Sequence, residues 1–575
     1  MSLFGRQIYH LNKKAVLTDG SERKRRMKRR HKPALIVCLL IFIVAVVGLA
    51  THIIRKYTPT RAQMDLNTYY GEVADGEAAI ILGTEILETR GTTYDGEGYL
   101  PIEVVNNRLN KRYYWDAENQ QVLYATPSEL TATPASQEGG QEVWLKDGKV
   151  YLSIPFIKKY TDIDSYVYED PSRIAIQYQF TDVNMAEVSR DTYVRYRGGI
   201  KSEVLTRVNK GDRLLFLEEL EDWCQVATQD GYIGYVQKRH IGEPQTITID
   251  RDFQTEEYTY HTIDEPVNLV WHQVTNAEAN AGLAEAVQNV TGVNVISPTW
   301  YTILDNAGNI TSIASADYVN QAHERGMQVW GLIDNFSVDI STMEVLSKTS
   351  SRQNLISQLM ESALSVGLDG INVDFESLSE DVGIHFLQFL RELSIECHKN
   401  NLVLSVDNPV PADFTSHYDR EEQGNVVDYV IIMGYDEHYV GSEQAGSVAS
   451  LPWVEEGIKQ TLQEVPAERV INAVPFYTRL WRTANGELTS EAIGMDQAQE
   501  VIAANNVETY WDKEAGQNYG SYESEGATYQ IWLEDAQSIA AKVMLVPKYE
   551  LAGVAAWKLG FENSGIWQVI TENLQ

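Results

Sequence analysis

The sequence contains little cysteine. Only three cysteines occur among its 575 residues, Cys38, Cys224 and Cys397, which is too few for a framework of disulfide bonds. A glycine-rich loop that would cradle phosphates is also missing, as is an ordered Ser/His/Asp set. Four histidines that follow residue 265 show no metal-ligand spacing: His272, His385, His417 and His438. We therefore expect neither a metal nor a cofactor.

Basic residues are scarce outside the N-terminus. The formal net charge is -34, but residues 1–33 hold 11 Lys or Arg against Asp19 and Glu22. Because that segment contributes about +9, the rest of the chain is near -43. Such an acidic bulk does not favour binding of nucleic acid or other anionic polymers through net charge. Recognition of a ligand should instead depend on local contacts.

Long apolar runs are missing except for one, at residues 34–54. This run contains no Asp, Glu, Lys or Arg and is long enough to cross a bilayer as a helix. The basic block Arg23–Lys32 precedes it, so residues 1–33 are predicted to be a cytoplasmic tail and residues after about 57 to be extracellular. Cleavage after Ala50 as a signal peptide is the alternative. The block's position beside a span also disfavours a nucleic-acid role.

Residues 66–185 contain an internal repeat. Asp95-Gly96-x-x-Tyr99-Leu100-x-Ile102-x-x-Val105 returns 52 residues later as Asp147-Gly148-x-x-Tyr151-Leu152-x-Ile154-x-x-Ile157. Each copy reads as a turn, a short strand and the start of a helix, with residues 126–142 predicted as a loop between the halves. The two copies predict one small α+β domain. This pattern resembles the N-terminal domain of copper amine oxidases, without a set of metal ligands.

Residues 190–242 form a series of short predicted strands. Gly211-Asp212, Trp223 and the turn Gly231-Tyr232-Ile233-Gly234-Tyr235-Val236 resemble features of a bacterial SH3 domain. The resemblance implies a small β-barrel that binds cell-wall peptide or glycan. A spacer whose Trp223 is only a core residue is the competing interpretation.

Strands and helices alternate over residues 265–575. Eight apolar strand candidates suit a (β/α)8 barrel, and they begin near Val267, Val293, Val329, Leu368, Leu402, Val427, Val470 and Leu551. Residues 485–530 lack an amphipathic helical pattern and predict a small insertion after the seventh strand. The predicted fold class is therefore multidomain, with one transmembrane helix, an α+β domain, an SH3-like domain and a C-terminal TIM barrel.

The octapeptide Asp-Gly-Ile-Asn-Val-Asp-Phe-Glu at residues 369–376 carries the clearest chemical signal. Read as a strand of period two, it places Asn372, Asp374 and Glu376 on one face and three apolar side chains on the other. Helical patterns flank it on both sides. Carboxylates at the C-terminal end of a strand lie where barrel enzymes keep their catalytic groups. The octapeptide therefore indicates acid/base chemistry.

Four motifs follow one another in this part of the chain: Asp369-Gly370-x-x-x-Asp374-x-Glu376, Met433-Gly434-Tyr435-Asp436, Val474-Pro475-Phe476-Tyr477-x-Arg479, and Gly553-Val554-Ala555-Ala556-Trp557-x-Leu559-Gly560. Together they resemble glycoside hydrolase family 18, the chitinases and related N-acetylglucosaminidases. Ser297-Pro298-Thr299-Trp300-Tyr301 and Asn372, which stands in place of an aspartate, resemble the branch of spore-germination and cell-wall glucosaminidases. An amide at 372 cannot share a proton with Asp374, so the pH profile should differ from that of chitinases.

The resemblance implies a role for each motif residue. Glu376 is the proton donor, kept protonated by its neighbour Asp374. The 2-acetamido oxygen of the substrate attacks the anomeric carbon, so no protein nucleophile is needed. Asp374 orients the acetamido group, and Tyr435 donates a hydrogen bond to its carbonyl. Further substrate contacts are expected at Asn372, Met433, Asp436, Arg479 and Trp557, and at Trp300 and Trp481 if their rings stack on sugars.

These residues predict a membrane-anchored extracellular glycosidase that acts on a polysaccharide containing N-acetylglucosamine. The anchor and the SH3-like module favour β-1,4 bonds of peptidoglycan over chitin, with retention at the anomeric carbon. A catalytically silent glycan-binding protein that uses the same cleft is one alternative, disfavoured because Glu376 is present. A plain chitinase is the other.

Overall fold

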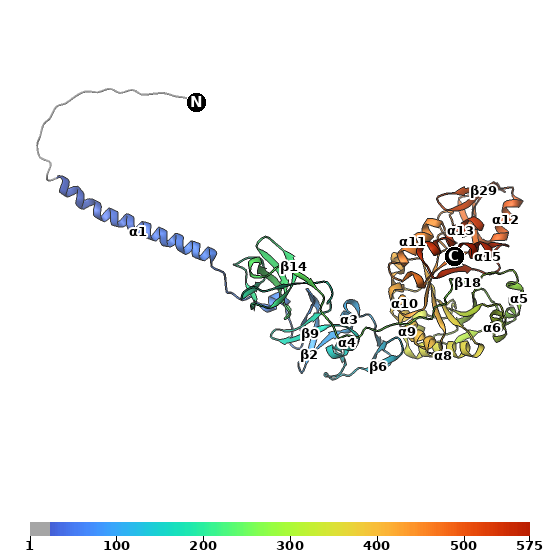
Figure 1. The fold of residues 1–575 in the computed structure, drawn as a ribbon, viewed down its shortest axis with the longest axis horizontal. Helices are drawn as coiled ribbons and strands as arrows, with labels where there is room; N and C mark the ends of the chain where they lie inside the picture. The colour runs from blue at the N-terminus through green and yellow to red at the C-terminus, as the bar shows by residue number, and fades with distance from the viewer. Residues whose placement is uncertain (1–22, 575) are drawn as a thin grey trace, which may run out of the picture. The chain divides into compact units, whose positions relative to one another are not determined.

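The computed structural model describes residues 23–574 of the chain, with side chains from residue 34 onward (Figure 1). The tail predicted for residues 1–33 therefore lies largely outside the described residues. The chain forms two compact units, and each is described by itself. The first combines the segment up to Gly96 with Ile163–Arg251, and the second combines Glu97–Asp162 with Asp252–Gln575.

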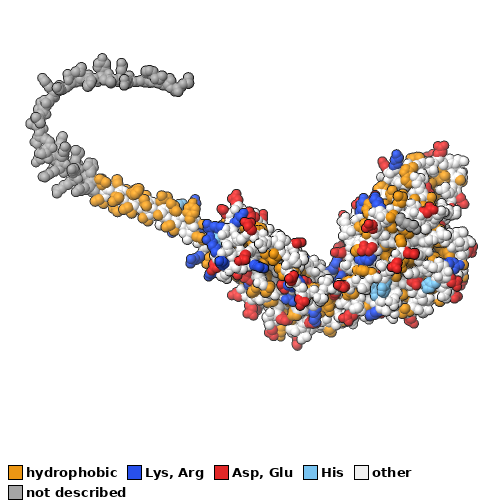
Figure 2. All heavy atoms as spheres, in the orientation of Figure 1, with side chains coloured by type: hydrophobic (Ala, Val, Ile, Leu, Met, Phe, Trp, Pro, Cys, Tyr) orange, Lys and Arg blue, Asp and Glu red, His pale blue; other side chains and the backbone are white. Residues whose placement is uncertain are grey.

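Helix α1 (Arg23–Tyr57) contains the apolar run. Its section Ala34–Tyr57 has a mean hydropathy of 3.1 in its most apolar window, and none of that window is buried. Figure 2 shows apolar side chains covering this section of the helix. By length and composition α1 fits a membrane anchor or a signal sequence, because both meet the same criteria.

The first unit contains a sheet of short antiparallel strands in the order β13-β12-β16-β15-β14-β11-β17. The strands are β11 (Val183–Glu187), β12 (Thr192–Arg195), β13 (Val204–Val208), β14 (Arg213–Glu219), β15 (Trp223–Ala227), β16 (Ile233–Gln237) and β17 (Gln245–Ile247). Their inward side chains, including Val194, Leu205 and Val226, form the core. Beside them, β1 (Ala78–Leu82) pairs with β2 (Glu85–Tyr94) and β10 (Ser172–Gln177).

The repeat is present at the level of the backbone. Asp147 and Gly148 have positive φ angles of 51° and 76°, as Asp95 and Gly96 do, which a tight turn before a strand requires. Strands β3 (Glu97–Pro101) and β8 (Lys149–Ser153) lead into helices α3 (Ile102–Arg108) and α4 (Ile154–Tyr160), and β3 pairs antiparallel with β8. The segment predicted as a loop contains strand β6 (Leu130–Pro134), because it pairs with β5 (Gln121–Ala125).

A buried ion-pair network explains why residues 97–162 group with the barrel segment. The Arg112 guanidinium donates to Glu422 at 2.8 Å and to Glu256 at 2.9 Å, and Arg391 also donates to Glu422. Two guanidinium groups hold the pKa of the Glu422 carboxyl below its usual range despite burial. Removing one partner of such a buried pair is costly.

The second unit contains the predicted eight-stranded barrel. All eight strands are parallel, and β18 pairs with both β19 and β31, so that the sheet closes. The strands are β18 (Val267–His272), β19 (Val295–Ile303), β21 (Gln328–Asp334), β22 (Gly370–Asp374), β23 (Val403–Pro409), β24 (Tyr429–Met433), β25 (Val470–Pro475) and β31 (Gly553–Trp557). The fold class predicted from the sequence is confirmed.

Helices surround this barrel (Figure 1). They are α5 (Leu283–Ala286), α6 (Ala316–His323), α7 (Thr342–Ser347), α8 (Thr349–Val366), α9 (Gly383–Lys399), α10 (Arg420–Val426), α11 (Leu451–Thr461), α13 (Ala536–Val543), α14 (Leu545–Tyr549) and α15 (Ile566–Asn573). Helix α8 ends at Gly367, whose left-handed backbone (φ 78°) caps it as expected.

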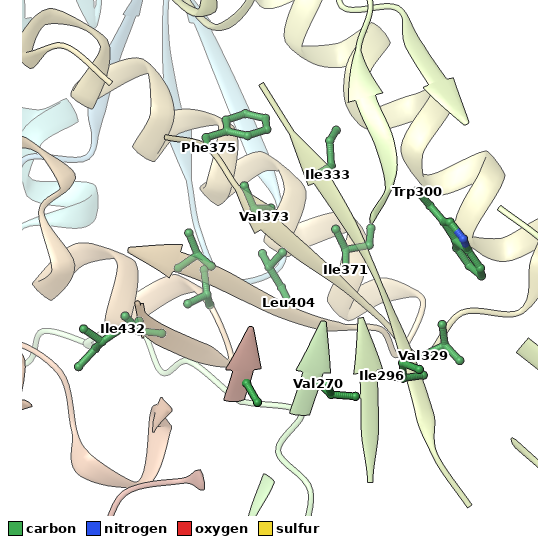
Figure 3. Packing of buried hydrophobic residues seen from close by; sticks show 14 of the residues in the cluster. Val270, Ile296, Trp300, Val329, Ile333, Ile371, Val373, Phe375, Leu404 and Ile432 are labelled. Atoms are coloured by element: carbon green, nitrogen blue, oxygen red, sulfur yellow. The ribbon is translucent and has the colours of Figure 1, made fainter. Parts of the chain in front are cut away.

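Alternate residues of each strand face opposite sides of the barrel wall. Outward side chains such as Val270, Ile371 and Val373 join one large cluster with the helices (Figure 3). Inward side chains, Trp271 and Leu332 among them, form a separate cluster inside the barrel. Because Ile371 and Val373 face the helices, Asn372 and Asp374 face the interior, as the period of two predicts.

The insertion is larger than the sequence indicates. A five-stranded antiparallel sheet in the order β27-β26-β30-β29-β28 follows β25. Its strands are β26 (Tyr477–Ala484), β27 (Glu487–Gly494), β28 (Tyr510–Asp512), β29 (Gln517–Ser524) and β30 (Ala527–Leu533), with helix α12 (Met495–Ala504) between them. The sheet begins before residue 485 because β26 pairs along its whole length with β27.

Candidate active site

Strand β22 is tightly packed against its neighbours where it begins, at Gly370. A Cβ at Gly370 would stand 2.7 Å from the Trp330 ring and 2.8 Å from the Val403 carbonyl oxygen, so the strand can approach its neighbours only with glycine there. Beyond the strand, the Phe375 ring stacks on Phe389 at 5.4 Å. This packing fixes the path of the chain between Asp374 and Glu376.

A second contact holds Glu376 by its backbone. The Asn335 amide donates to the Glu376 carbonyl oxygen at 3.0 Å, and its oxygen accepts from the Glu376 backbone N–H at 2.9 Å. Asn335 follows β21, the strand next to β22. Sequence reasoning missed this residue, because nothing in its local pattern shows which loop it faces.

Glu376 lies at the mouth of the barrel with its side chain exposed. The protein that surrounds its carboxyl still removes part of the water, and this desolvation raises the pKa of Glu376, with the negative charges of Asp436 and Asp334 adding to it. A carboxylic acid with a raised pKa and access to solvent is suited to donate a proton near neutral pH.

Three aspartates occupy neighbouring strands below Glu376. Asp334 ends β21, Asp374 ends β22, and Asp407 belongs to β23; their exposed fractions are 8%, 6% and 1%. Burial raises the pKa of all three carboxyls. For Asp374, the charges of Asp407, Glu376 and Asp334 raise the pKa further. Sequence reasoning missed Asp334 and Asp407, although each stands at the end of an apolar strand pattern.

Asn372 lies one step deeper in the barrel and is fully buried. Its amide oxygen accepts from Trp271 Nε1 at 2.9 Å and from Ser297 Oγ at 3.3 Å. Its amide nitrogen donates to Ser405 Oγ at 3.0 Å and to Asp407 Oδ1 at 2.8 Å. The amide thus makes four hydrogen bonds to three other strands.

Tyr435 and Asp436 follow β24 on the same end of the barrel. The charges of Asp374, Asp407 and Glu376 act on Tyr435, whose pKa burial raises well above its usual value, with Tyr477 the next cause. Tyr435 therefore keeps its proton and remains a hydrogen-bond donor. The Tyr477 hydroxyl donates to Asp436 Oδ1 at 2.7 Å, which links the motif after the sixth barrel strand, β24, to the motif of the seventh, β25.

The remaining predicted contacts separate into two groups. Trp557 ends β31 half-buried, with its ring 6.0 Å from that of Trp271. Trp300 and Trp481 are only 2% and 1% exposed, and their indole N–H groups donate to Asn280 and to the Gly446 carbonyl inside the protein. Neither presents a free ring face, so both leave the set of sugar-stacking candidates.

Two polar or flexible candidates lie at strand ends. Met433 ends β24 half-buried. Arg479, in β26, donates from Nη1 to Ser490 Oγ at 3.1 Å, and its Nε is buried without a hydrogen-bond partner among the described residues. A guanidinium whose buried Nε has no acceptor is suited to a polar ligand group. Among the described residues no cluster of three His, Cys, Asp or Glu could hold a metal ion.

The fold and this carboxylate cluster define an enzyme that hydrolyses glycosidic bonds. The family model of glycosyl hydrolases family 18 matches residues 334–562, and that of the bacterial SH3 domain matches residues 190–242. The barrel is accordingly a family 18 glycosyl hydrolase domain, and the first unit carries a bacterial SH3 domain. The resemblance of residues 66–185 to copper amine oxidases stays a prediction.

Curated relatives cover the same part of the chain. This chain is 25% identical over 293 residues to the uncharacterized glycosylase YvbX of Bacillus subtilis. The matched segment covers 49% of this chain and 84% of that protein. The chain is 27% identical over 238 residues to the cortical fragment-lytic enzyme of Bacillus subtilis, 40% of this chain and 55% of that one. The chain thus spans little more than half of the latter.

A solved structure supports the fold. The spore cortex-lytic enzyme SleL of Bacillus cereus superimposes with a TM-score of 0.50 at 20% identity, covering 58% of this chain and 78% of that one. At this identity the likeness establishes the barrel fold.

Proposed function

We propose that this chain cleaves β-1,4 bonds beside N-acetylglucosamine in peptidoglycan, by a substrate-assisted mechanism that retains the anomeric configuration. The position of Glu376 carries the proposal. Its carboxyl is exposed at the barrel mouth with a raised pKa, above a buried Asp374 and next to Tyr435.

The proposed reaction assigns one step to each group. Glu376 gives its proton to the leaving glycosidic oxygen as the acetamido oxygen of the substrate bonds to the anomeric carbon. Asp374 balances the positive charge that develops on the acetamido group, and Tyr435 donates a hydrogen bond to it. Water then attacks the anomeric carbon, Glu376 takes up one of its protons, and the acetamido group is released.

The choice of peptidoglycan rests on the modules around the barrel. A bacterial SH3 domain accompanies it, and two of the similar proteins named above bear names that refer to spore cortex, a peptidoglycan layer. We propose that the SH3 domain contacts the wall and that α1 is an uncleaved anchor with the barrel outside the cell. Intact-mass analysis of the protein extracted from membranes tests the anchor, because cleavage after Ala50 would remove most of the helix.

The experiment compares the full-length protein, purified in detergent, with Glu376→Gln. Each is incubated with purified peptidoglycan and with chitin oligomers, and released sugars are analysed by mass spectrometry. Glu380→Gln is the matched control, because Glu380 is an exposed glutamate in the same loop. We expect the protein and the control, but not Glu376→Gln, to release fragments from peptidoglycan. Release from chitin alone would refute the wall assignment, and equal background from all samples would indicate a binding protein.

A further inference from the structure

Asn372 hydrogen-bonds to Asp407 of the neighbouring strand and not to Asp374, the aspartate of its own strand. Its amide nitrogen donates to Asp407 Oδ1 at 2.8 Å, whereas Asp374 Oδ1 is buried without a hydrogen-bond partner among the described residues. A buried carboxylate oxygen with no donor is costly. Either a proton on one of the acids or a substrate group must satisfy it.

Asp407 lies beside Asp374 on the other neighbouring strand, β23. In the parallel pair β22–β23, Asn372 is opposite Ser405 and Val373 is opposite Val406, so the next residues along the two strands are Asp374 and Asp407. Val373 and Val406 both pack outward into the core, so these two aspartates share the inner face. The charge of Asp407 is also the strongest electrostatic influence on Asp374.

The surroundings of this pair offer no cation. Asp334 faces it from β21, Glu376 from the chain after β22, and Tyr435 from the chain after β24. None of the ion pairs formed by the described residues includes Asp374 or Asp407. Two buried carboxyls without a counter-ion cannot both ionise, so they retain a proton between them.

We propose that Asp407 is a positioning residue for hydrolysis, which holds one proton in common with Asp374 and takes up the carboxylate function that Asn372 cannot perform. The proposal rests on the proposed function. When positive charge develops on the substrate's acetamido group beside Asp374, the proton moves to Asp407 and leaves the negative charge on Asp374. No bond to the protein forms, and the proton returns when the acetamido group is released. Asn372 keeps Asp407 in place throughout.

The carboxylate that could have stood at position 372 stands at position 407 instead. This placement explains the hydrogen bonds of Asn372. An aspartate at 372 would set a carboxylate oxygen against Asp407 Oδ1, where the amide now donates. Asparagine at 372 with aspartate at 407 therefore forms a matched pair. The reverse pair, aspartate at 372 with asparagine at 407, would keep one hydrogen bond in the same place with donor and acceptor exchanged.

The test uses the full-length protein in three forms: wild type, Asp407→Asn, and the exchange variant Asn372→Asp/Asp407→Asn. Rates on purified peptidoglycan strands are measured from pH 4 to 9. We expect Asp407→Asn to lower kcat by about 10- to 100-fold. It should also shift the acid limb of the profile, because Asp374 then titrates as a single acid instead of as one half of a pair that shares a proton. The exchange variant should recover most of kcat and return the acid limb.

Two results would overturn the proposal. One is an Asp407→Asn protein with the rate and profile of the wild type. The other is an exchange variant no better than Asp407→Asn, which would give Asp407 a merely structural role. Asparagine is close to isosteric with aspartate and can still accept from Asn372, so the single variant should fold.

A second measurement does not depend on activity. Burial raises the pKa of Asp374 and Asp407 in the folded protein, and the charge of Asp407 raises that of Asp374 further. Folding therefore takes up protons. The melting temperature of the barrel should therefore fall as pH rises from about 4, the unfolded pKa, through the raised folded values, and fall less in Asp407→Asn. If no glycan is cut, the proposed function fails, and equal slopes in this measurement would separately refute the shared proton.

Discussion

Asp334 lies directly opposite Asp374 in the parallel register of β21 and β22. Thr302 Oγ1 and the Phe336 backbone N–H donate to the Asp334 carboxyl at 3.1 Å and 3.0 Å, which fixes it beside the catalytic strand. Asp374 therefore has an acid on each side, Asp334 on one neighbouring strand and Asp407 on the other. The site is therefore built from three adjacent strands, β21, β22 and β23, and not from the octapeptide alone.

Replacing Asp334 should change the pH profile at its basic end. The charge of Asp334 raises the pKa of Glu376, and Glu376 must be protonated to act as an acid. In Asp334→Asn the pKa of Glu376 falls, so the basic limb of kcat/KM should shift to lower pH. Asp339→Asn is the control, because Asp339 is exposed in the same loop. An unchanged basic limb in Asp334→Asn would contradict this role.

Removal of the proton donor should reduce turnover without unfolding the protein. General acid catalysis typically contributes about 10²- to 10⁴-fold, and we expect Glu376→Gln to lose kcat by about this factor. The hydrogen bonds that hold Glu376 to Asn335 are made by its backbone and remain in this variant, so the melting temperature should change little. Parallel measurement of kcat and thermal unfolding checks both points; a variant with normal kcat would exclude Glu376 as the donor.

Loss of the two hydrogen bonds between the Asn335 side chain and the Glu376 backbone should lower the rate more than the stability. Asn335→Ala removes both hydrogen bonds to the Glu376 backbone and leaves the loop free to shift. A displacement of about 1 Å at a reacting group can cost roughly 100-fold in rate. We expect a fall in kcat of about 10- to 100-fold with KM nearly unchanged. Wild-type kcat in this variant would show that Phe375 packing alone positions Glu376.

Two tryptophans should respond in opposite ways to truncation. Trp557→Ala should raise KM by removing a half-buried ring at the end of β31, with a small effect on stability. Trp300→Ala should destabilise the fold by about 3–5 kcal/mol, because its ring is in the core and its N–H donates to Asn280. Thermal unfolding and KM measured on both variants distinguish these outcomes. A KM effect confined to Trp300→Ala would reverse the assignment.

The sequence predicted the barrel well because its strands are apolar runs at regular intervals. The interior placement of Asn372 and Asp374 followed from the alternation of one strand. Asp334, Asn335 and Asp407 could not be assigned, because their proximity to Glu376 depends on which strands are neighbours and on register. These are properties of the closed sheet.

Aromatic residues were harder to place than carboxylates. Trp300, Trp481 and Trp557 all stand near strand ends, where an aromatic ring can either line a cleft or fill the space beneath the helices. Burial decided between these uses, and local sequence does not encode it. Similarly, the polar composition of residues 126–142 concealed strand β6, which forms because β5 provides a pairing edge.

Closure of the barrel through β18 has a consequence for fragments of this protein. A fragment limited to residues 334–562, the extent of the family match, would lack β18, β19 and nearly all of β21. Strands β22 and β31 would then become open edges that invite aggregation. The indole donor of Trp271, which holds Asn372 from the first strand, would also be absent. The smallest part of this chain able to carry the complete site therefore begins before Val267.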